Sequence, residues 1–154
     1  MSNEEVAAVF RRLADLMELC DDNPFKLRAF RNAAEVLEDL NTPLAEIVAV
    51  SGAAALRELP CIGAAISGKI IEILETGTCR AYEEIKREIP ESVLDLLRVE
   101  GVGIRTAQLL YRQFKITTLD ELAKFVRGGG LQSVPRLGDK AQSRIAASVF
   151  KLVP

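Results

Sequence analysis

The chain has 154 residues, 49% of them hydrophobic and 27% charged, which is enough to bury a core in one domain or two small ones. It contains no histidine, which nearly excludes a zinc site of the usual kind and removes most acid–base and triad chemistry. The three cysteines show no paired-ligand spacing, and no apolar run approaches the roughly 20 residues of a membrane span. Because the acidic amino terminus is also unlike a signal peptide, we expect a reducing, cytoplasmic compartment and no membrane partner.

The net charge of −2 is unevenly distributed along the chain. Residues 1–100 hold 11 Lys/Arg and 19 Asp/Glu, a balance of −8, whereas residues 101–154 hold 9 and 3, a balance of +6. Such asymmetry suggests that the carboxy-terminal part meets a polyanion. The alternative is that the two parts attract each other.

A first helix is predicted close to the amino terminus. Apolar residues recur at steps of three and four from Val6 to Cys20, which predicts an amphipathic first helix. Asn23 can cap a second helix, with Pro24 at its first position, where a missing N–H costs nothing. We expect the inward residues of this helix to be Phe30, Ala34, Leu37 and Leu40.

Shorter helices follow. One is predicted between "NTP" at 41–43 and "SG" at 51–52, and another lies between residue 63 and "ETGT" at 75–78. The inward residues of the latter are Ile66, Ile70 and Ile73. A further helix covers about 79–88, and "IPES" at 89–92 begins another after the dense charge run, which makes this proline our predicted domain boundary.

The carboxy-terminal part continues the pattern. A helix to about Lys115 is followed by Thr118 and Glu121 at capping-box spacing, and "GGG" at 128–130 predicts a loop before the final helix. No stretch shows sustained alternation with period two. We therefore predict an all-α fold built from helical hairpins.

Three segments share one skeleton, a short apolar lead followed by x-[IVL]-G and a helix. They are "LPCIGAAISGKI" at 59–70, "VEGVGIRTAQLLYR" at 99–112 and "VPRLGDKAQSRI" at 134–145, with shared glycines Gly63, Gly103 and Gly138. A tight turn that ends in a helix exposes backbone N–H groups without intrahelical partners, and these favour an anion. Glycine there allows a phosphate to approach bare backbone. The alternative is that the glycines only close hairpins between helices.

Cationic side chains are more numerous near the second and third turns than near the first, which makes these two turns the better candidates for DNA contact. Arg105 follows the second turn, whereas Lys140 and Arg144 follow the third and Arg136 lies inside it. After the first turn only Lys69 is charged. We predict DNA contacts through Gly101, Val102, Gly103, Arg105, Arg136, Gly138, Lys140 and Arg144, with Lys26 and Gly63 as further candidates. Such phosphate contacts carry no sequence information.

These residues resemble a known motif and a known family. "VEGVGIRTAQLLYR" resembles the helix-hairpin-helix motif of sequence-independent DNA-binding proteins. "NPFKLRAFRNAAEVLEDL", "LRELPCIGAAISGKIIEILETG" and "VPRLGDKAQSRI" resemble the amino-terminal portion of family X, β-like DNA polymerases. The likeness covers nearly the whole chain. It implies a helical lyase-type domain at 1–88 and a DNA-gripping domain with two further hairpins at 89–154.

The resemblance also implies functional residues in the first domain. Lys69 falls at the position of the family's Schiff-base nucleophile, Lys26 at a 5′-phosphate contact and Phe30 at a pocket aromatic. Several departures count against lyase activity. Ala65 and Ala81 stand where lyase-competent relatives carry lysines, Gly68 replaces a glutamate, and Glu100 replaces a proline. Cys61 and Arg136 replace the first glycine of their turns, which costs about 1 kcal/mol each if that position needs positive φ.

Three functions follow as alternatives. We expect sequence-independent binding to the backbone of nicked, gapped or duplex DNA, in DNA repair and, in a bacterium, near the nucleoid. No palm segment follows the third hairpin, so polymerase activity is not expected of this chain, whether it is free-standing or a piece of a longer protein. The alternatives are a 5′-deoxyribose-phosphate or abasic-site lyase using Lys69, and a scaffold that binds a protein through the acidic first half. No cofactor is expected beyond a sodium or potassium ion, which carbonyl groups at family hairpins can ligate.

Overall fold

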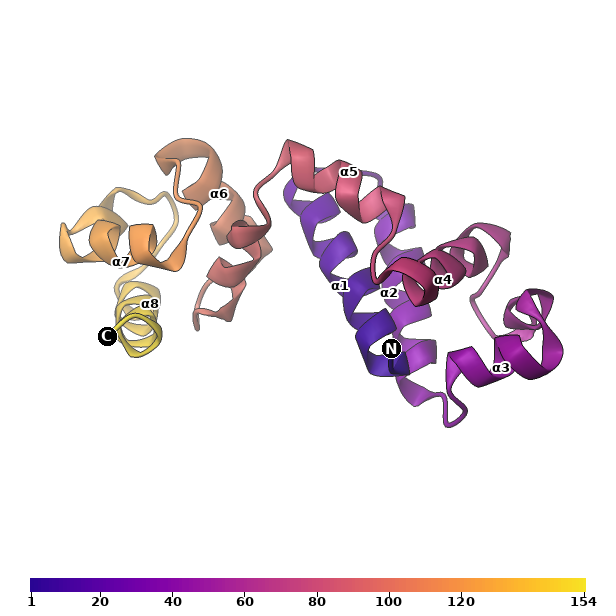
Figure 1. The fold of residues 1–154 in the computed structure, drawn as a ribbon. Coiled ribbons are helices and arrows are strands. Elements are labelled where there is room, and N and C mark those ends of the chain that lie inside the picture. Colours follow the sequence, from indigo (N-terminus) through magenta and orange to yellow (C-terminus); the bar gives the residue numbers. More distant parts are fainter. The chain divides into compact units, whose positions relative to one another are not determined.

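A computed structural model describes all the residues from Met1 to Pro154, and its regular elements are helices only. The predicted all-α fold is confirmed. The chain divides into two compact units, Met1–Glu88 and Ile89–Pro154, so the division falls next to Pro90 (Figure 1).

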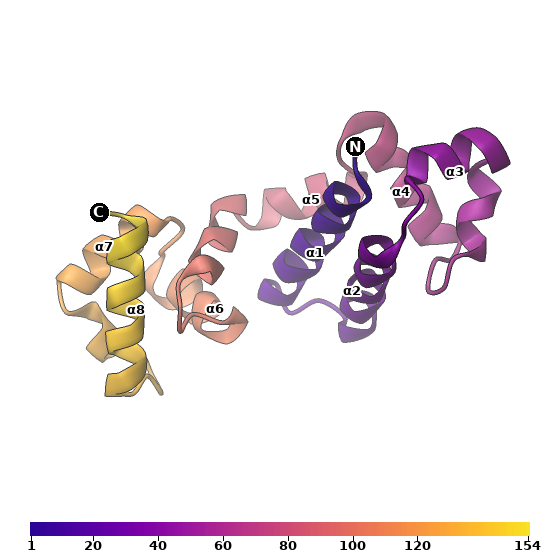
Figure 2. The ribbon, with the colours of Figure 1, turned by 90° about the horizontal axis from the view of Figure 1, so that it is seen from below.

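Unit 1 is built around a pair of long helices. Its elements are α1 (Asn3–Leu19), α2 (Pro24–Asp39), α3 (Leu44–Ser51), the 3-10 helix η1 (Ala53–Glu58), α4 (Ala64–Thr76) and α5 (Arg80–Glu88). α1 and α2 lie side by side as an antiparallel hairpin (Figures 1 and 2). The α4 and α5 helices also pack against α1, which is thereby the central helix of the unit.

Local sequence explains where the long helices begin. The Ser2 hydroxyl accepts a hydrogen bond from the N–H of Glu5 at 3.1 Å, which satisfies one of the unpaired donors at the start of α1. At α2, the predicted cap is confirmed, because the Asn23 side chain accepts from the N–H of Phe25 at 2.9 Å, with Pro24 at the first position.

The core of unit 1 forms where the predicted apolar faces meet. Phe10, Leu13 and Leu37 are fully buried. From α4, Ile70 and Ile73 are fully buried, as predicted. Two residues expected to point inward, Phe30 and Leu40, are only half-buried. For Leu40 the reason is that α2 ends at Asp39.

A link that the sequence pattern did not predict ties the start of α1 to the segment after α2. The Asn3 side-chain amide donates to the carbonyl of Thr42 at 2.9 Å, and its oxygen accepts from the N–H of Leu44 at 2.8 Å. One side chain thereby satisfies backbone groups on both sides of the turn that leads into α3.

Ion pairs reinforce the hairpin from outside. Arg11 donates to both carboxylate oxygens of Glu38, at 2.8 and 2.6 Å, and Arg31 binds Asp15 and Glu18 at 3.0 and 2.7 Å. The hydrogen bond from Arg11 lowers the pKa of Glu38 below its ordinary value. Such a carboxylate stabilises the fold above its unfolded pKa, and the stabilisation is lost as pH falls through the lower, folded value.

Glu38→Gln is therefore expected to lower the free energy of unfolding near neutral pH by only about 0.5 kcal/mol, because both side chains are partly solvated. The deficit should disappear as pH falls through the lowered pKa of Glu38, because the wild-type carboxylate is then protonated as well. Urea denaturation at neutral pH and along an acid series measures both differences. An equal deficit at every pH would show that packing, and not the charge pair, stabilises this position.

Unit 2 contains the other two turns. Its elements are the 3-10 helix η2 (Glu91–Arg98), α6 (Ile104–Phe114), α7 (Leu119–Arg127), the 3-10 helix η3 (Gly130–Ser133) and α8 (Asp139–Leu152). The helix predicted after "IPES" is 3-10 and not α. Its buried residues Val93 and Leu96, together with its buried C-cap Val99, recur every three positions, which matches the three residues per turn of a 3-10 helix. In the predicted "GGG" loop, Gly128 caps α7 and Gly130 already begins η3.

The predicted capping box is only half formed. The Thr118 hydroxyl accepts from the N–H of Glu121 at 3.1 Å, as expected at the start of α7. The Glu121 carboxylate, however, accepts at 3.0 Å from the N–H of Thr117, one residue earlier than the motif requires. Together these two hydrogen bonds fix the extended backbone at Thr118, where α7 begins.

Candidate nucleic-acid interface

The three predicted turns share one backbone geometry. Their first positions are Cys61, Gly101 and Arg136, with φ of 63°, 92° and 63°. Their last positions are Gly63, Gly103 and Gly138, with φ of −93°, −94° and −75°, each serving as the N-cap of the following helix. The repeated skeleton therefore encodes one repeated turn, in which the left-handed residue comes first.

The left-handed position carries a cost where it is not glycine. An L-residue loses about 1–2 kcal/mol in this conformation, and Cys61 and Arg136 both adopt it. At Gly101 the constraint is double, because a Cβ there would also lie 3.0 Å from Cγ1 of buried Ile145. Only glycine fits the second turn as it is packed.

Cys61→Gly is accordingly expected to stabilise unit 1. The relief of left-handed strain exceeds the extra entropy of glycine in the unfolded chain by about 0.5 kcal/mol. Thermal denaturation measures the effect, with Cys20→Gly as the control, because Cys20 has an ordinary negative φ of −94°. The control should destabilise the chain, and a loss of stability in both variants would contradict the argument.

Neither the backbone conformation nor the neighbouring atoms require a glycine at the last position of each turn. All three have negative φ, and a Cβ built on Gly63, Gly103 or Gly138 meets no atom of the chain within 4 Å. Open space is thus left on the outside of all three turns. This space lies next to the backbone N–H groups that begin α4, α6 and α8.

Those N–H groups have no partner within the chain. The first intrahelical bonds are made by the N–H groups of Ser67, Ala107 and Gln142, each to the carbonyl of its N-cap glycine. The three residues before each of these donors, 64–66, 104–106 and 139–141, donate no backbone hydrogen bond. Each turn therefore presents three unpaired amides at the positive end of a helix, which is the arrangement that binds a phosphate.

The second turn is also attached to α8. The N–H of Glu100 donates to the hydroxyl of Ser148 at 2.9 Å, and the side chain of Ser148 is buried. A Cβ on Gly101 would lie 3.6 Å from the carbonyl oxygen of Ala141, in the first turn of α8. Because α8 begins directly after the third turn, these contacts bring the second and third turns together.

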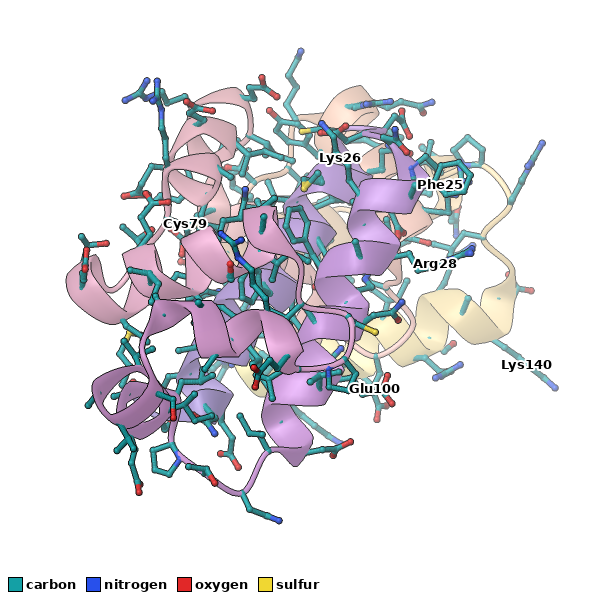
Figure 3. All side chains as sticks on the ribbon, turned by 90° about the vertical axis from the view of Figure 1, so that its right-hand side faces the viewer. Phe25, Lys26, Arg28, Cys79, Glu100 and Lys140 are labelled. Carbon is teal, nitrogen blue, oxygen red and sulfur yellow. The ribbon has the colours of Figure 1, made fainter.

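The predicted cations around these turns have no acidic partners. Arg105, Arg136, Lys140 and Arg144 are exposed, and none forms an ion pair. Lys140 extends from α8 into solvent in Figure 3. The exposed carboxylates Glu100 and Asp139 stand beside the second and third turns and oppose an anion there. The third turn, with three cations against one carboxylate, is the more cationic of the two.

Val102 differs from the other predicted contacts, because it is buried and its N–H donates to the carbonyl of Val99 at 3.0 Å. Ile62 occupies the same position in the first turn and is also buried. The middle residue of the turn thus anchors it to the core, and Val102 offers a ligand no free amide.

In unit 1, the residues singled out by the resemblance meet in one cavity. It has a volume of about 620 Å³ and is lined by Lys26, Phe30, Gly63 and Lys69 among others. The Lys69 Nζ lies 5.8 Å from the centre of the Phe30 ring, which stacks on Phe10 at 5.9 Å. Figure 3 shows Lys26 at the beginning of α2 beside Phe25 and Arg28.

The remainder of the cavity lining is less favourable to an anion. Asp22, Glu84 and Glu88 contribute three carboxylates against the two lysines. Ala65 and Ala81, the two departures from lyase-competent relatives, also line it. No group of three or more His, Cys, Asp or Glu residues is placed to hold a metal ion. Cys79 lies buried in this unit, and burial raises the pKa of its thiol.

None of the helices combines the length and the apolar character that crossing a bilayer requires.

Comparison with known proteins agrees with the geometry. Residues 1–79 match the family model of the helix-hairpin-helix domain, and residues 93–148 match that of the SAM-like helix-hairpin-helix tandem. The chain is 28% identical over 148 residues to the DNA polymerase/3'-5' exonuclease PolX of Bacillus subtilis (strain 168), across 94% of this chain and 24% of that protein. It is 33% identical over 98 residues to the DNA-directed DNA/RNA polymerase mu of Homo sapiens, across 63% of this chain and 18% of that one.

The chain spans a quarter or less of the length of these two relatives. The first family match contains the turn at Cys61–Gly63, and the second contains the other two turns. The chain belongs to the helix-hairpin-helix family and is related to the amino-terminal region of family X DNA polymerases.

Proposed function

We propose that this chain binds the phosphate backbone of DNA, without reading sequence, through the second and third hairpin turns. The observation that carries the proposal is the open space outside Gly103 and Gly138, beside three unpaired amides at each turn. A glycine that the fold itself does not need is explained by a partner that approaches the backbone closely. The unpaired cations Arg105, Arg136, Lys140 and Arg144 surround the same turns.

Salt dependence tests this proposal directly. With three or four phosphates neutralised, the logarithm of the binding constant should fall with the logarithm of salt concentration with a slope of about −3. Fluorescence anisotropy on a nicked duplex, between about 50 and 200 mM salt, measures the slope. Affinity should be micromolar and insensitive to sequence. Binding that does not change over this range of salt would refute backbone recognition.

The relatives' names are those of DNA polymerases, one of them also an exonuclease, and they belong to much longer proteins. We assign to this chain the part that contacts DNA, in a repair role and without polymerisation of its own. Sodium or potassium at the hairpin carbonyls remains a proposal as well. The carbonyl of Leu137 already accepts from the Gln142 side chain at 3.0 Å, which leaves it one lone pair for an ion.

A second candidate function is a 5′-deoxyribose-phosphate or abasic-site lyase, which the cavity at Lys69 favours. The neutral lysine amine would add to the C1′ aldehyde and expel water to give an iminium. Loss of a C2′ proton would then release the 3′ phosphate. Borohydride trapping on an incised abasic duplex tests this function. An adduct that forms in the wild type and is lost in Lys69→Ala supports it, whereas no adduct, or one that persists, removes it.

A protein partner is a third candidate, favoured by the charge of unit 1. Residues 1–88 hold 10 Lys/Arg and 16 Asp/Glu, a balance of −6, whereas residues 89–154 hold 10 and 6, a balance of +4. A pull-down with and without residues 1–88 tests it. A partner retained only by the full chain would support a scaffold role, and an unchanged set of partners would exclude one.

A further inference from the structure

The outward face of α8 carries more positive charge than the third hairpin turn can use. Lys140, Arg144 and Lys151 are exposed and lie four and then seven residues apart, which places them within a narrow arc of the helix. Their separation along the axis is about 16.5 Å from the first to the last. A phosphate held at the start of α8 reaches Lys140, but Lys151 is three turns away from it.

No carboxylate forms an ion pair on this face, although exposed Glu100 is hydrogen-bonded through its N–H to Ser148, one turn after Arg144. None of the three cations forms an ion pair, although unit 1 pairs Arg11, Arg31 and Arg80 with acids. The one acidic residue of α8, Asp139, is in its first turn, off the arc. Exposed Ser143 and Ala147 separate the cations. The result is a cationic stripe without ion pairs, which suits an extended polyanion.

An aromatic side chain flanks the far end of the stripe: Phe150 directly precedes Lys151 but lies about 100° around α8 from it, on the side of Asp139. Phe150 is 38% exposed, and the Arg127 guanidinium of α7 lies over its ring at 5.4 Å from the centre. The ring and the guanidinium that lies over it together form a surface on which an unpaired base can stack. A base inside a duplex cannot reach such a surface, whereas a base in a single strand can.

We infer that the outward face of α8 is a track for a single-stranded DNA segment that continues from the duplex held at the third hairpin. Lys140, Arg144 and Lys151 contact three phosphates spread along the track, and Phe150 with Arg127 receives a base beside its far end. A stacked strand carries one phosphate per about 3.4 Å, so the stripe spans roughly five phosphates. This inference rests on the proposed function and names its DNA structure: a duplex with an unpaired tail.

The test compares a blunt duplex of about 20 base pairs with the same duplex carrying an unpaired oligothymidine tail, at either the 3′ or the 5′ end, by fluorescence anisotropy. One stacked base and one added phosphate contact should make the wild-type chain prefer one tailed duplex about tenfold. Phe150→Ala should reduce that preference about fivefold. Lys151→Ala should reduce it about threefold and reduce the salt slope on tailed DNA by about 0.7.

Matched variants distinguish an effect on the track from a general effect of charge and from an effect on folding. Both substitutions should leave blunt-duplex affinity within about twofold, since the hairpin turns are untouched. Lys115→Asn removes one exposed charge from the far end of α6, where φ is 59° and asparagine is tolerated, and it should not change the preference. Phe150→Leu keeps the apolar contact without the ring, and it should lose the preference as Phe150→Ala does. Lys151→Arg should retain it.

The outcomes also distinguish the inference from the proposed function. If blunt duplexes bind but a tail adds nothing, or if Phe150→Ala weakens both probes equally, the track is wrong and the hairpin contacts stand. If polyglutamate displaces the tail as well as oligothymidine does, the face accepts acidic chains in general and the track is again wrong. If no duplex binds at all, the proposed function itself is wrong.

Discussion

Replacing Gly103 and Gly138 together by alanine is expected to weaken binding to nicked duplex DNA at least about tenfold, with almost no change in stability. Both residues have negative φ, and a Cβ at either meets nothing within 4 Å, so the fold accommodates alanine. The methyl groups would stand between the strand and the free amides of α6 and α8. A charge-assisted hydrogen bond is lost once its partners are held beyond about 3.2 Å, and two such losses account for the expected effect.

Gly101→Ala provides the matched control, two residues away in the same turn. At φ 92°, and 3.0 Å from Ile145, an added Cβ strains the backbone and the core, and we expect a loss of about 1–2 kcal/mol in the free energy of unfolding. Denaturant titration and anisotropy on the same samples should separate the two effects. If the alanines at 103 and 138 leave DNA affinity within twofold, the cationic side chains alone make the contact and the amides are not used.

Much of the fold followed from short stretches of sequence because its causes are local. The Asn23–Pro24 start of α2, the Thr118 cap of α7 and the apolar face of α1 each depend on residues a few positions apart. The hairpin turns were predictable for the same reason. Their skeleton occurs three times, and the left-handed first position follows from the tightness of the turn and not from distant packing.

What the sequence did not predict depends on contacts between distant positions. Ser148 holds the second turn against α8 across 48 residues, and Asn3 closes the segment before α3 across 41. Neither residue belongs to a recognisable pattern, because a single polar side chain on a helix has many potential partners. No spacing in the chain indicates that Lys26, Phe30 and Lys69 share one cavity, and only the family resemblance pointed to these residues.

Phe10→Ala is expected to produce the largest loss of stability, about 3–5 kcal/mol, and to confine it to unit 1. The Phe10 side chain is fully buried, and its ring stacks on Phe30 with an angle of 14° between the planes. Removing it leaves a cavity between α1 and α2. Phe25→Ala is the control, because the same change at a residue that is 78% exposed should cost less than about 0.5 kcal/mol.

The consequence for DNA binding makes Phe10→Ala informative about function. Under the proposed function the turns that grip DNA lie in residues 99–103 and 134–138, whose contacts are made within unit 2. A chain with unit 1 unfolded should therefore bind a duplex lacking 5′ phosphates with an affinity within about threefold of wild type. The reason is that unit 1, with a net charge of −6, contributes no attraction to a polyanion. Anisotropy measured at a temperature between the unfolding transition of unit 1 and that of unit 2 tests this expectation. Loss of binding with the first transition would place part of the interface in unit 1 and would shift the proposal toward the cavity at Lys69.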